Sequence, residues 1–237
     1  MPFSPPDAKG SAEPPDSPDR YSRQEILPGV GKEGQKKWAE AKVLVAGEGP
    51  ALQAGVTALA STGVNKLFIL NSPLPNSAFP QFQTSGRQMQ ILPPDSKEFP
   101  DTSIAVVLSE NAEFRRNLNR VFRKYPRPVL FGWPAGSGFA LFFTQYGQEG
   151  SNGSCPCLEC FEIMNPKAFT NGTPSVQRLL GAAVVSEALL WILKPNSPLL
   201  NKVWITSLDE GVSYYHEVSA TYKCPARMIE EGAKITP

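Results

Sequence analysis

The sequence of 237 residues contains a single histidine, His216, and no excess of charge of either sign. One histidine leaves almost no room for Ser-His or Cys-His catalysis, because both need an imidazole as the general base. The 23 basic and 22 acidic residues give a net charge of +1. That balance offers no electrostatic reason to expect binding to nucleic acid or to an anionic membrane.

The chain also lacks a basic N-terminal segment followed by an apolar core, which a secretory signal peptide requires. Residues 1–18 are instead rich in proline, serine and aspartate, a composition typical of a disordered tail. The most apolar long stretch, residues 176–193, contains Arg178 and Glu187, which favours a buried helix over a membrane span. We therefore expect a cytoplasmic protein.

What is present is an alternation of buried strands and helices. Residues 42–49 and 65–72 fit strands, and residues 51–64 between them fit a helix that Gly63 ends. A strand, a helix and a strand within about thirty residues form the βαβ unit of a parallel sheet. Further strands are expected at 103–109, 128–133 and 138–147, a hairpin at 202–219, and helices within 19–38, at 110–125 and at 175–194, the last capped by Ser175.

These elements predict one α/β domain over residues 19–237, with a doubly wound, largely parallel sheet and a C-terminal hairpin. Residues 19–150 would form a nucleotide-binding-like half, and residues 151–237 would carry a Cys-rich loop, the long helix and the terminal strands. Residues 71–100 are rich in proline, serine, glutamine and asparagine, which predicts a long loop. Ligands of such sheets bind outside the carboxyl ends of the strands.

The first strand runs into Gly47-Glu48-Gly49, which opens like a phosphate-binding loop. Backbone N–H groups at a helix start bind phosphate, and glycines let the phosphate approach them. The glycine expected three residues after Gly49 is replaced by Leu52, and Glu48 adds a negative charge. The loop therefore fits either an altered nucleotide site or a purely structural turn.

The order of motifs along the chain resembles the ThiF/MoeB/HesA family, the bacterial relatives of ubiquitin-activating enzymes. The resemblance covers residues 19–228 and rests on RYSRQ at 20–24, the glycine loop, CLEC at 157–160, the helix after residue 180 and TYKCPA at 221–226. It implies a Rossmann-like sheet, ATP and magnesium on the glycine loop, and adenylation of the C-terminal glycine of a ubiquitin-like carrier protein. It also implies a dimer in which an arginine, here Arg23, reaches the partner's ATP.

The ATP pocket departs from the family pattern at several positions. The family's D-x-D pair after the second strand becomes Asn71-Ser72-Pro73, so only Asn71 remains to hold a ribose hydroxyl. The phosphate-binding arginine of the family's S-N-L-x-R-Q segment becomes Phe82. Arg87 lies five residues later, a spacing that argues against substitution, and Lys97 is the only lysine on the crossover loop.

The segment after the third strand of the family pattern is only partly kept. The family has an aspartate-asparagine pair there, whose aspartate binds magnesium, and this chain has Glu110-Asn111. A longer glutamate can ligate magnesium, although octahedral geometry is strict. Capping of the next helix is an equal alternative. The loop before the long helix contains no cysteine, so thioester or persulfide transfer at that position is not expected.

The cysteines match most of the family's zinc knot. Cys157-x-x-Cys160 fits the first half of a C-x-x-C…C-x-x-C site, and Cys224 fits the third ligand. The fourth position is Arg227, which leaves Cys155 as the candidate fourth ligand and His216 as a weaker one. The alternative to structural zinc is a set of reduced, partly buried thiols.

Three functions remain open on the sequence. The chain is a catalytically degenerate subunit that dimerises with an active relative and lends Arg23 in trans, an active adenylyltransferase of a ubiquitin-like carrier protein, or a non-catalytic module that binds a carrier or peptide. The first explains best which motifs are kept, because it needs Arg23 but no working nucleotide site. The nucleotide site of this chain would be degenerate, formed by Gly47, Gly49, Asn71, Glu110 and Asn111. A homodimer and a heterodimer are both compatible with it.

Overall fold

The computed structural model describes residues 20–70, 87–93, 96, 99–147, 156–164, 172–221 and 223–230. Four residues discussed above, Asn71, Phe82, Lys97 and Cys155, lie outside the described residues, as does the predicted tail of residues 1–18.

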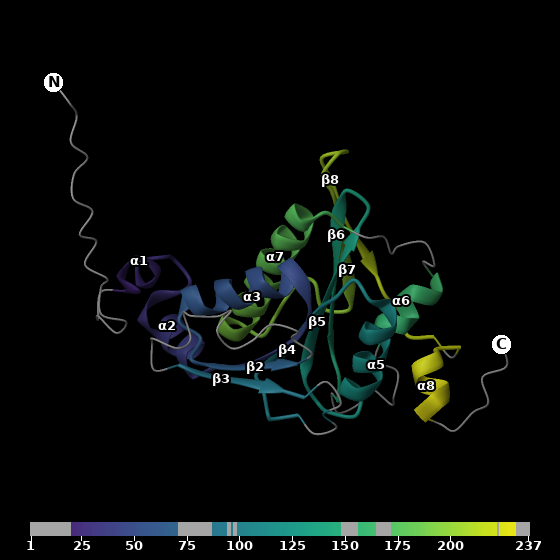
Figure 1. Cartoon of the computed structure of the whole chain (residues 1–237), viewed down its shortest axis with the longest axis horizontal. Coiled ribbons are helices and arrows are strands. Elements are labelled where there is room, and N and C mark those ends of the chain that lie inside the picture. Colours follow the sequence, from purple (N-terminus) through teal and green to yellow (C-terminus); the bar gives the residue numbers. More distant parts are fainter. Residues whose placement is uncertain are drawn as a thin grey trace.

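One sheet of eight strands, in the order β3-β2-β1-β4-β5-β6-β7-β8, organises the chain (Figure 1). The strands from β3 to β5 are parallel, and β6, β7 and β8 join antiparallel. The predicted doubly wound α/β class and the C-terminal hairpin are confirmed. The strands are β1 (Lys42–Gly47), β2 (Lys66–Leu70), β3 (Gln88–Leu92), β4 (Ile104–Leu108), β5 (Pro128–Ala135), β6 (Gly138–Gln145), β7 (Lys202–Ser207) and β8 (Val212–Glu217).

Helices cover both faces of this sheet because its inner strands are apolar on both sides. In β1, Val43 and Val45 belong to one buried cluster, whereas Leu44 and Ala46 belong to another. The first cluster includes residues of α2 (Gly31–Glu40), α3 (Gly49–Thr62) and α7 (Pro174–Leu193). The second includes residues of α5 (Ala112–Phe122), α6 (Leu158–Met164) and α8 (Pro225–Glu230). The short α1 (Ser22–Glu25) precedes α2.

The long helix α7 packs against α3 through small residues. A Cβ atom on Gly181 would lie 2.2 Å from the carbonyl oxygen of Ala51, so only glycine permits this approach. By length and composition α7 is apolar enough to cross a membrane, but half of that window is buried inside the protein, which is the pattern of a core helix. Its N-cap is Thr173, whose hydroxyl accepts from the Val176 N–H at 3.4 Å. The predicted cap, Ser175, is therefore wrong by two residues.

Two other expectations are corrected by the structure. Residues 71–100 do not form one uninterrupted loop, because β3 lies within them and pairs parallel with β2. The expected Cys-rich loop is partly helical, because α6 begins directly after Cys157 and contains Cys160. The predicted helix end at Gly63 is confirmed, with a φ of 93°.

Candidate functional site

The sheet reverses its order between β1 and β4, and the crevice at such a switch point is where doubly wound proteins bind ligands. A cavity of about 190 Å³ opens there, at the carboxyl ends of the two strands. Ligand pockets usually measure roughly 300–1,000 Å³, so this cavity is small for a nucleotide. It is lined by residues of the glycine loop, the end of β4 and α7: Glu48, Gly49, Pro50, Ala51, Leu108, Ser109, Glu110, Pro134, Gln177 and Leu180.

Gly47 is required by the packing of the sheet itself. Its φ is +143°, and a Cβ atom there would lie 1.9 Å from the backbone oxygen of Leu108 on β4. Gly49, with a φ of +68°, begins α3. A Cβ atom added there would lie 3.4 Å from Gln177 Oε1, which is an ordinary van der Waals contact. The presence of Gly47 is thus explained by strand contact, without any phosphate.

A carboxylate occupies the loop at which a phosphate would bind. The Ser109 hydroxyl donates to Glu48 Oε1 at 2.6 Å, and the Asn111 N–H donates to the Ser109 hydroxyl at 3.0 Å. Glu48 is the N-cap residue of α3, although its side chain caps no backbone N–H. A negative charge at this helix start repels phosphate, which the free N–H groups would otherwise attract.

Glu110 and Asn111 both have partners within the chain. Glu110 Oε1 accepts from the Gln177 side chain and from the Gly172 N–H at 3.2 Å. Asn111 caps α5, because its Oδ1 accepts from the Phe114 N–H at 3.1 Å. The capping alternative is therefore confirmed for Asn111, while magnesium binding by Glu110 stays a prediction.

Arg115 is a buried cation under this pocket, and it belongs to none of the sequence motifs. It is fully buried, donates to the Ser109 carbonyl at 2.7 Å and lies 5.3 Å from the centre of the Trp133 ring. Burial lowers its pKa to about 10, against the opposing effect of carboxylates that include Glu162 and Glu48. The available signal was its position three residues before Leu118, on the apolar face of α5.

The arginine motif lies at the opposite end of α3 from this pocket. Gln24 donates to the Ser61 carbonyl at 3.1 Å, which places α1 beside the last turn of α3. A helix of 14 residues is about 21 Å long. Because α1 lies beside the last turn of α3 and Gly49 begins that helix, Arg23 is far from Gly49 of its own chain. The side chain of Arg23 is exposed.

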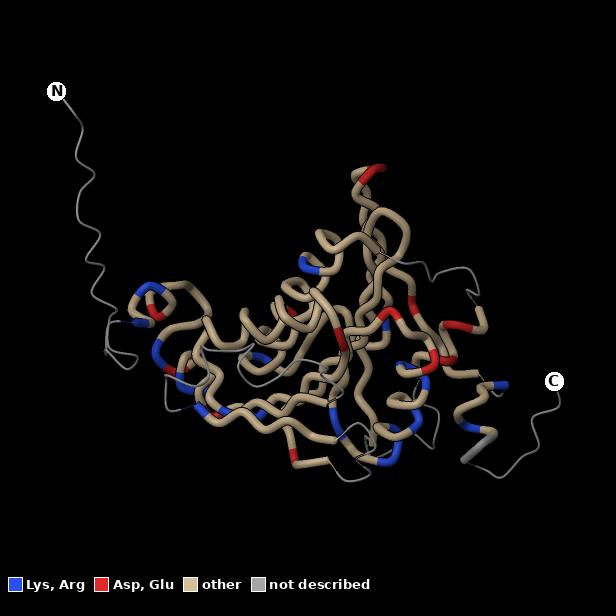
Figure 2. The backbone as a smooth tube through the Cα atoms, in the orientation of Figure 1, with Lys and Arg blue, Asp and Glu red and all other residues tan. Residues whose placement is uncertain are grey.

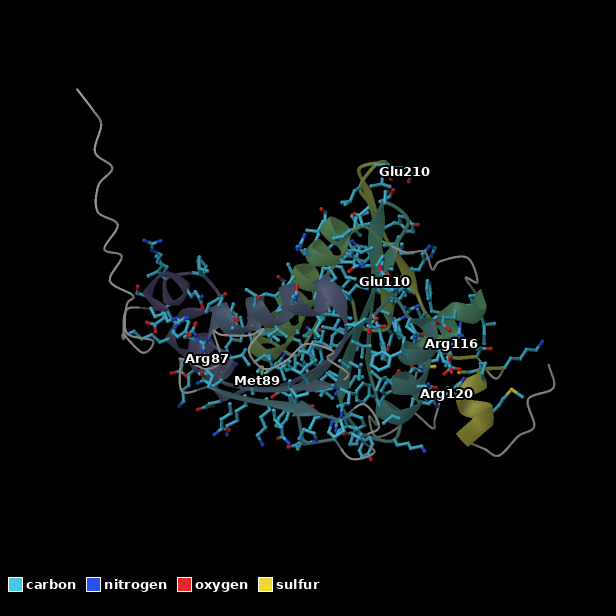
Figure 3. The ribbon with its side chains drawn as sticks, in the orientation of Figure 1. Arg87, Met89, Glu110, Arg116, Arg120 and Glu210 are labelled. Atoms are coloured by element: carbon cyan, nitrogen blue, oxygen red, sulfur yellow. The ribbon has the colours of Figure 1, made fainter. Side chains whose placement is uncertain are left out.

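Arg87 lies at the same remote end and does not substitute for the missing phosphate arginine. It donates to the Tyr21 hydroxyl and directly precedes β3, whose first residue pairs with Lys66 at the amino end of β2. Figure 3 shows Arg87 near α2 and the start of β3, well separated from Glu110.

Apolar side chains are exposed next to Arg23. Ile26 is 79% exposed and Leu27 is 51% exposed. A groove of about 390 Å³ continues from them between the turn before α2 and the end of α7. Its apolar lining includes Pro28, Val30, Leu190, Trp191, Leu193 and Pro198.

Cys157, Cys160 and Cys224 come together as predicted, with all three sulfur atoms within 4.8 Å of one another. The Cys157 sulfur lies 3.8 Å from that of Cys160 and 3.4 Å from that of Cys224. Tetrahedral zinc with bonds of about 2.3 Å holds its sulfur ligands roughly 3.8 Å apart, so the donor set fits zinc. His216 lies on exposed β8 against Tyr214 and is not part of the cluster.

Thiol–thiol hydrogen bonds already favour one thiolate in this cluster. Hydrogen bonds from Cys157 and Cys224 lower the pKa of the Cys160 thiol. The pKa of the Cys157 thiol is raised by its hydrogen bonds with Cys160 and Cys224 and by its burial. A metal ion would replace the shared protons, because it binds thiolates rather than thiols.

Asn119 orients the cluster from α5. Its Nδ2 lies 3.6 Å from the Cys157 sulfur and 3.1 Å from Glu159 Oε1. Its Oδ1 accepts from the Tyr146 hydroxyl at 2.5 Å and from the Leu158 N–H at 3.2 Å. Arg120 of α5, labelled in Figure 3, forms two hydrogen bonds to Glu159 of α6. Such supporting groups hold metal ligands in place.

Comparison with known proteins agrees with the predicted family. No family model matches the chain. The sulfur carrier protein ThiS adenylyltransferase of Bacillus subtilis (strain 168) is 26% identical over 204 residues, which cover 73% of this chain. The chain spans 58% of the length of that relative.

Solved structures share the fold at lower sequence identity. E. coli MccB with ATP has a TM-score of 0.64 at 16% identity, over 89% of this chain and 75% of that one. The microcin C7 biosynthetic enzyme MccB in complex with N-formylated MccA has a TM-score of 0.66 at 16% identity, over 90% and 76%. PaaA has a TM-score of 0.57 at 12% identity, over 86% and 74%. Together with the sequence relative, they support the ThiF/MoeB/HesA resemblance.

Proposed function

We propose that this chain, a member of the ThiF/MoeB/HesA family, is a catalytically degenerate subunit that pairs with an active relative and lends Arg23 to that relative's ATP site. The active subunit would adenylate a ubiquitin-like carrier protein. The sequence relative, a ThiS adenylyltransferase, supports this class of reaction. The observation that carries the proposal is the place of Arg23, at the far end of α3 from the pocket of its own chain.

The pocket supports the degenerate part of the proposal. Nucleotidyl transfer depends on cations placed around the phosphates, but Glu48 and Glu110 line this cavity. Arg115 does not supply the missing charge, because it is fully buried and donates to the Ser109 carbonyl. The cavity is also smaller than ligand pockets usually are.

The surface around Arg23 supports the partner. Ile26 and Leu27 follow Arg23 within four residues and are largely exposed, and exposed apolar patches mark interaction sites. A partner chain that covers them would bring its own ATP site to the exposed Arg23. We propose a heterodimer, because in a homodimer Arg23 would reach a pocket that Glu48 disfavours for phosphate.

The test is adenylation by the partner, measured with and without this chain. The chain should co-purify with an active relative, and Arg23→Ala should slow the partner's adenylation by about 10²-fold or more, the usual effect of removing a charge donor from a transition state. Lys36→Ala, which removes one exposed positive charge from neighbouring α2, is the matched control. An Arg23→Ala complex that forms normally and reacts at the full rate rules out the lending of Arg23.

A second candidate is an active adenylyltransferase or a carrier-binding module in its own right. The structural neighbours favour it, because MccB structures contain ATP or a peptide, MccA. Exchange of pyrophosphate into ATP by the isolated chain would establish an active enzyme. Binding of a carrier protein that does not depend on ATP would favour the module.

We further propose that the cysteine cluster holds one structural zinc ion. Cys157, Cys160 and Cys224 supply three thiolates, and Cys155 is proposed as the fourth ligand. Zinc bound in this closed site would join α6 to the segment before α8 and stabilise the fold without taking part in catalysis.

A further inference from the structure

Strand β8 forms one edge of the sheet and is exposed along its entire length. All six of its residues are exposed, with Tyr214 at 44% and Tyr215 at 59%. Among the described residues, only β7 pairs with it. Figure 1 shows the tip of the β7–β8 hairpin projecting beyond the helices, and no described segment pairs with the outer edge of β8.

This edge lacks the features that usually prevent pairing. Natural edge strands carry lysine, proline, bulges or inward charges, which keep other strands away. The sequence of β8, Val-Ser-Tyr-Tyr-His-Glu, contains no lysine, arginine, proline or glycine. Its one carboxylate, Glu217, lies at the end of the strand, 3.6 Å from the Lys202 ammonium. The remaining acidic groups of the hairpin, Asp209 and Glu210, lie at its tip (Figure 2).

The strand is also held in a fixed conformation before any partner arrives. Tyr215 stacks on Trp204 of β7 at 6.3 Å between ring centres, and Tyr214 packs edge-on against His216 at 5.3 Å. Thr206 and Ser213 join the two strands through their hydroxyls at 2.9 Å. A preorganised strand loses little conformational entropy when it pairs.

We propose that β8 pairs antiparallel with β8 of a second copy of this chain, across a twofold axis near Tyr214 and Tyr215. A twofold axis makes the interface self-complementary, and the tyrosines of the two copies would meet as cross-strand aromatic pairs. The charges permit this arrangement, since pairing centred on either tyrosine places no two carboxylates of β8 opposite each other. The two sheets would become one continuous sheet.

This contact is separate from the surface proposed to bind an active relative. α1 and the tip of the β7–β8 hairpin lie far apart in Figure 1. The two interfaces can therefore form at once, and each can be removed without the other.

The test is the mass of the full-length protein by sedimentation velocity over a range of concentrations. We expect a monomer–dimer equilibrium whose Kd rises about tenfold or more in Tyr214→Lys or Tyr215→Lys, because edge lysines oppose pairing and like charges meet across the axis. The larger effect identifies the tyrosine nearer the axis. Leu208→Lys is the matched control, because Leu208 is 46% exposed but lies outside β8, and it should leave Kd unchanged.

Hydrogen–deuterium exchange at low and high protein concentration locates the contact. Backbone amides of residues 212–217 should become protected as the concentration rises, and those of residues 22–30 should not. A monomer at every concentration overturns the proposal, as does a dimer that both tyrosine variants retain with no added protection in β8. Protection of β8 that appears only when another protein is added would assign this edge to that protein instead.

Discussion

The Ser109 hydroxyl and the Glu48 carboxylate are joined by a 2.6 Å hydrogen bond across the carboxyl ends of β4 and β1. The bond links the loop after β1 to the loop after β4 at the point where the sheet order reverses. It fixes a negative charge at the start of α3, where a nucleotide-binding relative would hold phosphate. The same contact therefore stabilises the fold and disfavours the ligand.

The first prediction concerns phosphate binding at this loop. Isothermal titration of the isolated chain with ATP and magnesium should give no binding signal. In Glu48→Gln, pyrophosphate affinity should rise by roughly fivefold or more, since about 1 kcal/mol of repulsion is removed at a partly exposed site. Glu113→Gln, on the exposed side of α5, should change nothing. Tight ATP binding by the unmodified chain would contradict the degenerate pocket.

The second prediction is that Gly47 is a folding residue. Gly47→Ala should lower the free energy of unfolding by about 3 kcal/mol or more, because its Cβ would collide with the Leu108 carbonyl. Gly211→Ala is the control for backbone strain alone: its φ is +65°, and nothing lies within 4 Å of the added atom. It should cost about 1 kcal/mol. Similar denaturation midpoints for the two variants would show that the close contact is relieved.

The sequence predicted the parts of the fold that depend on local pattern, and missed those that depend on contacts between distant segments. Apolar runs identified β1 and β2, and Gly63 marked the end of α3. Strand β3 was missed because its burial is partial and its pairing with β2 is non-local. For the candidate site, the three cysteines came from spacing, whereas the buried role of Arg115 depends on a carbonyl that only the folded chain brings to it.

The third prediction concerns Asn119, which is fully buried and contacts four groups around the cysteine cluster. Asn119→Ala removes the Oδ1 that accepts from the Tyr146 hydroxyl and from the Leu158 N–H. We expect a loss of about 3 kcal/mol in the free energy of unfolding, since removing one partner of a buried hydrogen bond costs about 1–3 kcal/mol. Asn117→Ala, exposed on the same helix, should stay within about 0.5 kcal/mol of the parent. Equal urea midpoints for the two variants would be inconsistent with this network.

The fourth prediction concerns the metal. Elemental analysis of the purified chain should find one zinc ion per chain, and Cys157→Ser should lose it, because this residue contacts both other thiols. A strong chelator should lower the thermal midpoint of the parent but not that of the variant, since metal binding is coupled to folding. Cys155→Ser tests the fourth ligand and should weaken zinc binding. A zinc-free parent whose melting is unaffected by chelator would indicate reduced thiols.

The fifth prediction follows from Glu187, half-buried on α7 beside the apolar groove. Among the described residues it has no hydrogen bond or ion pair, and burial raises the pKa of its carboxyl group. The folded protein therefore binds this proton more tightly than the unfolded chain does. The stabilisation from that proton is complete below the unfolded pKa of about 4.3 and is lost as the pH rises through the higher folded pKa.

Glu187→Gln keeps the shape of the side chain but removes its charge. The variant should unfold at higher urea concentration than the parent at pH 7, where the parent buries a carboxylate. The difference should shrink as the pH falls and vanish below about pH 4, where the parent side chain is also neutral. Glu113→Gln, at an exposed carboxylate on α5, should show no such pH-dependent gain. A gain for Glu187→Gln that is the same at pH 4 and pH 7 would mean that packing, rather than charge burial, limits stability at this position.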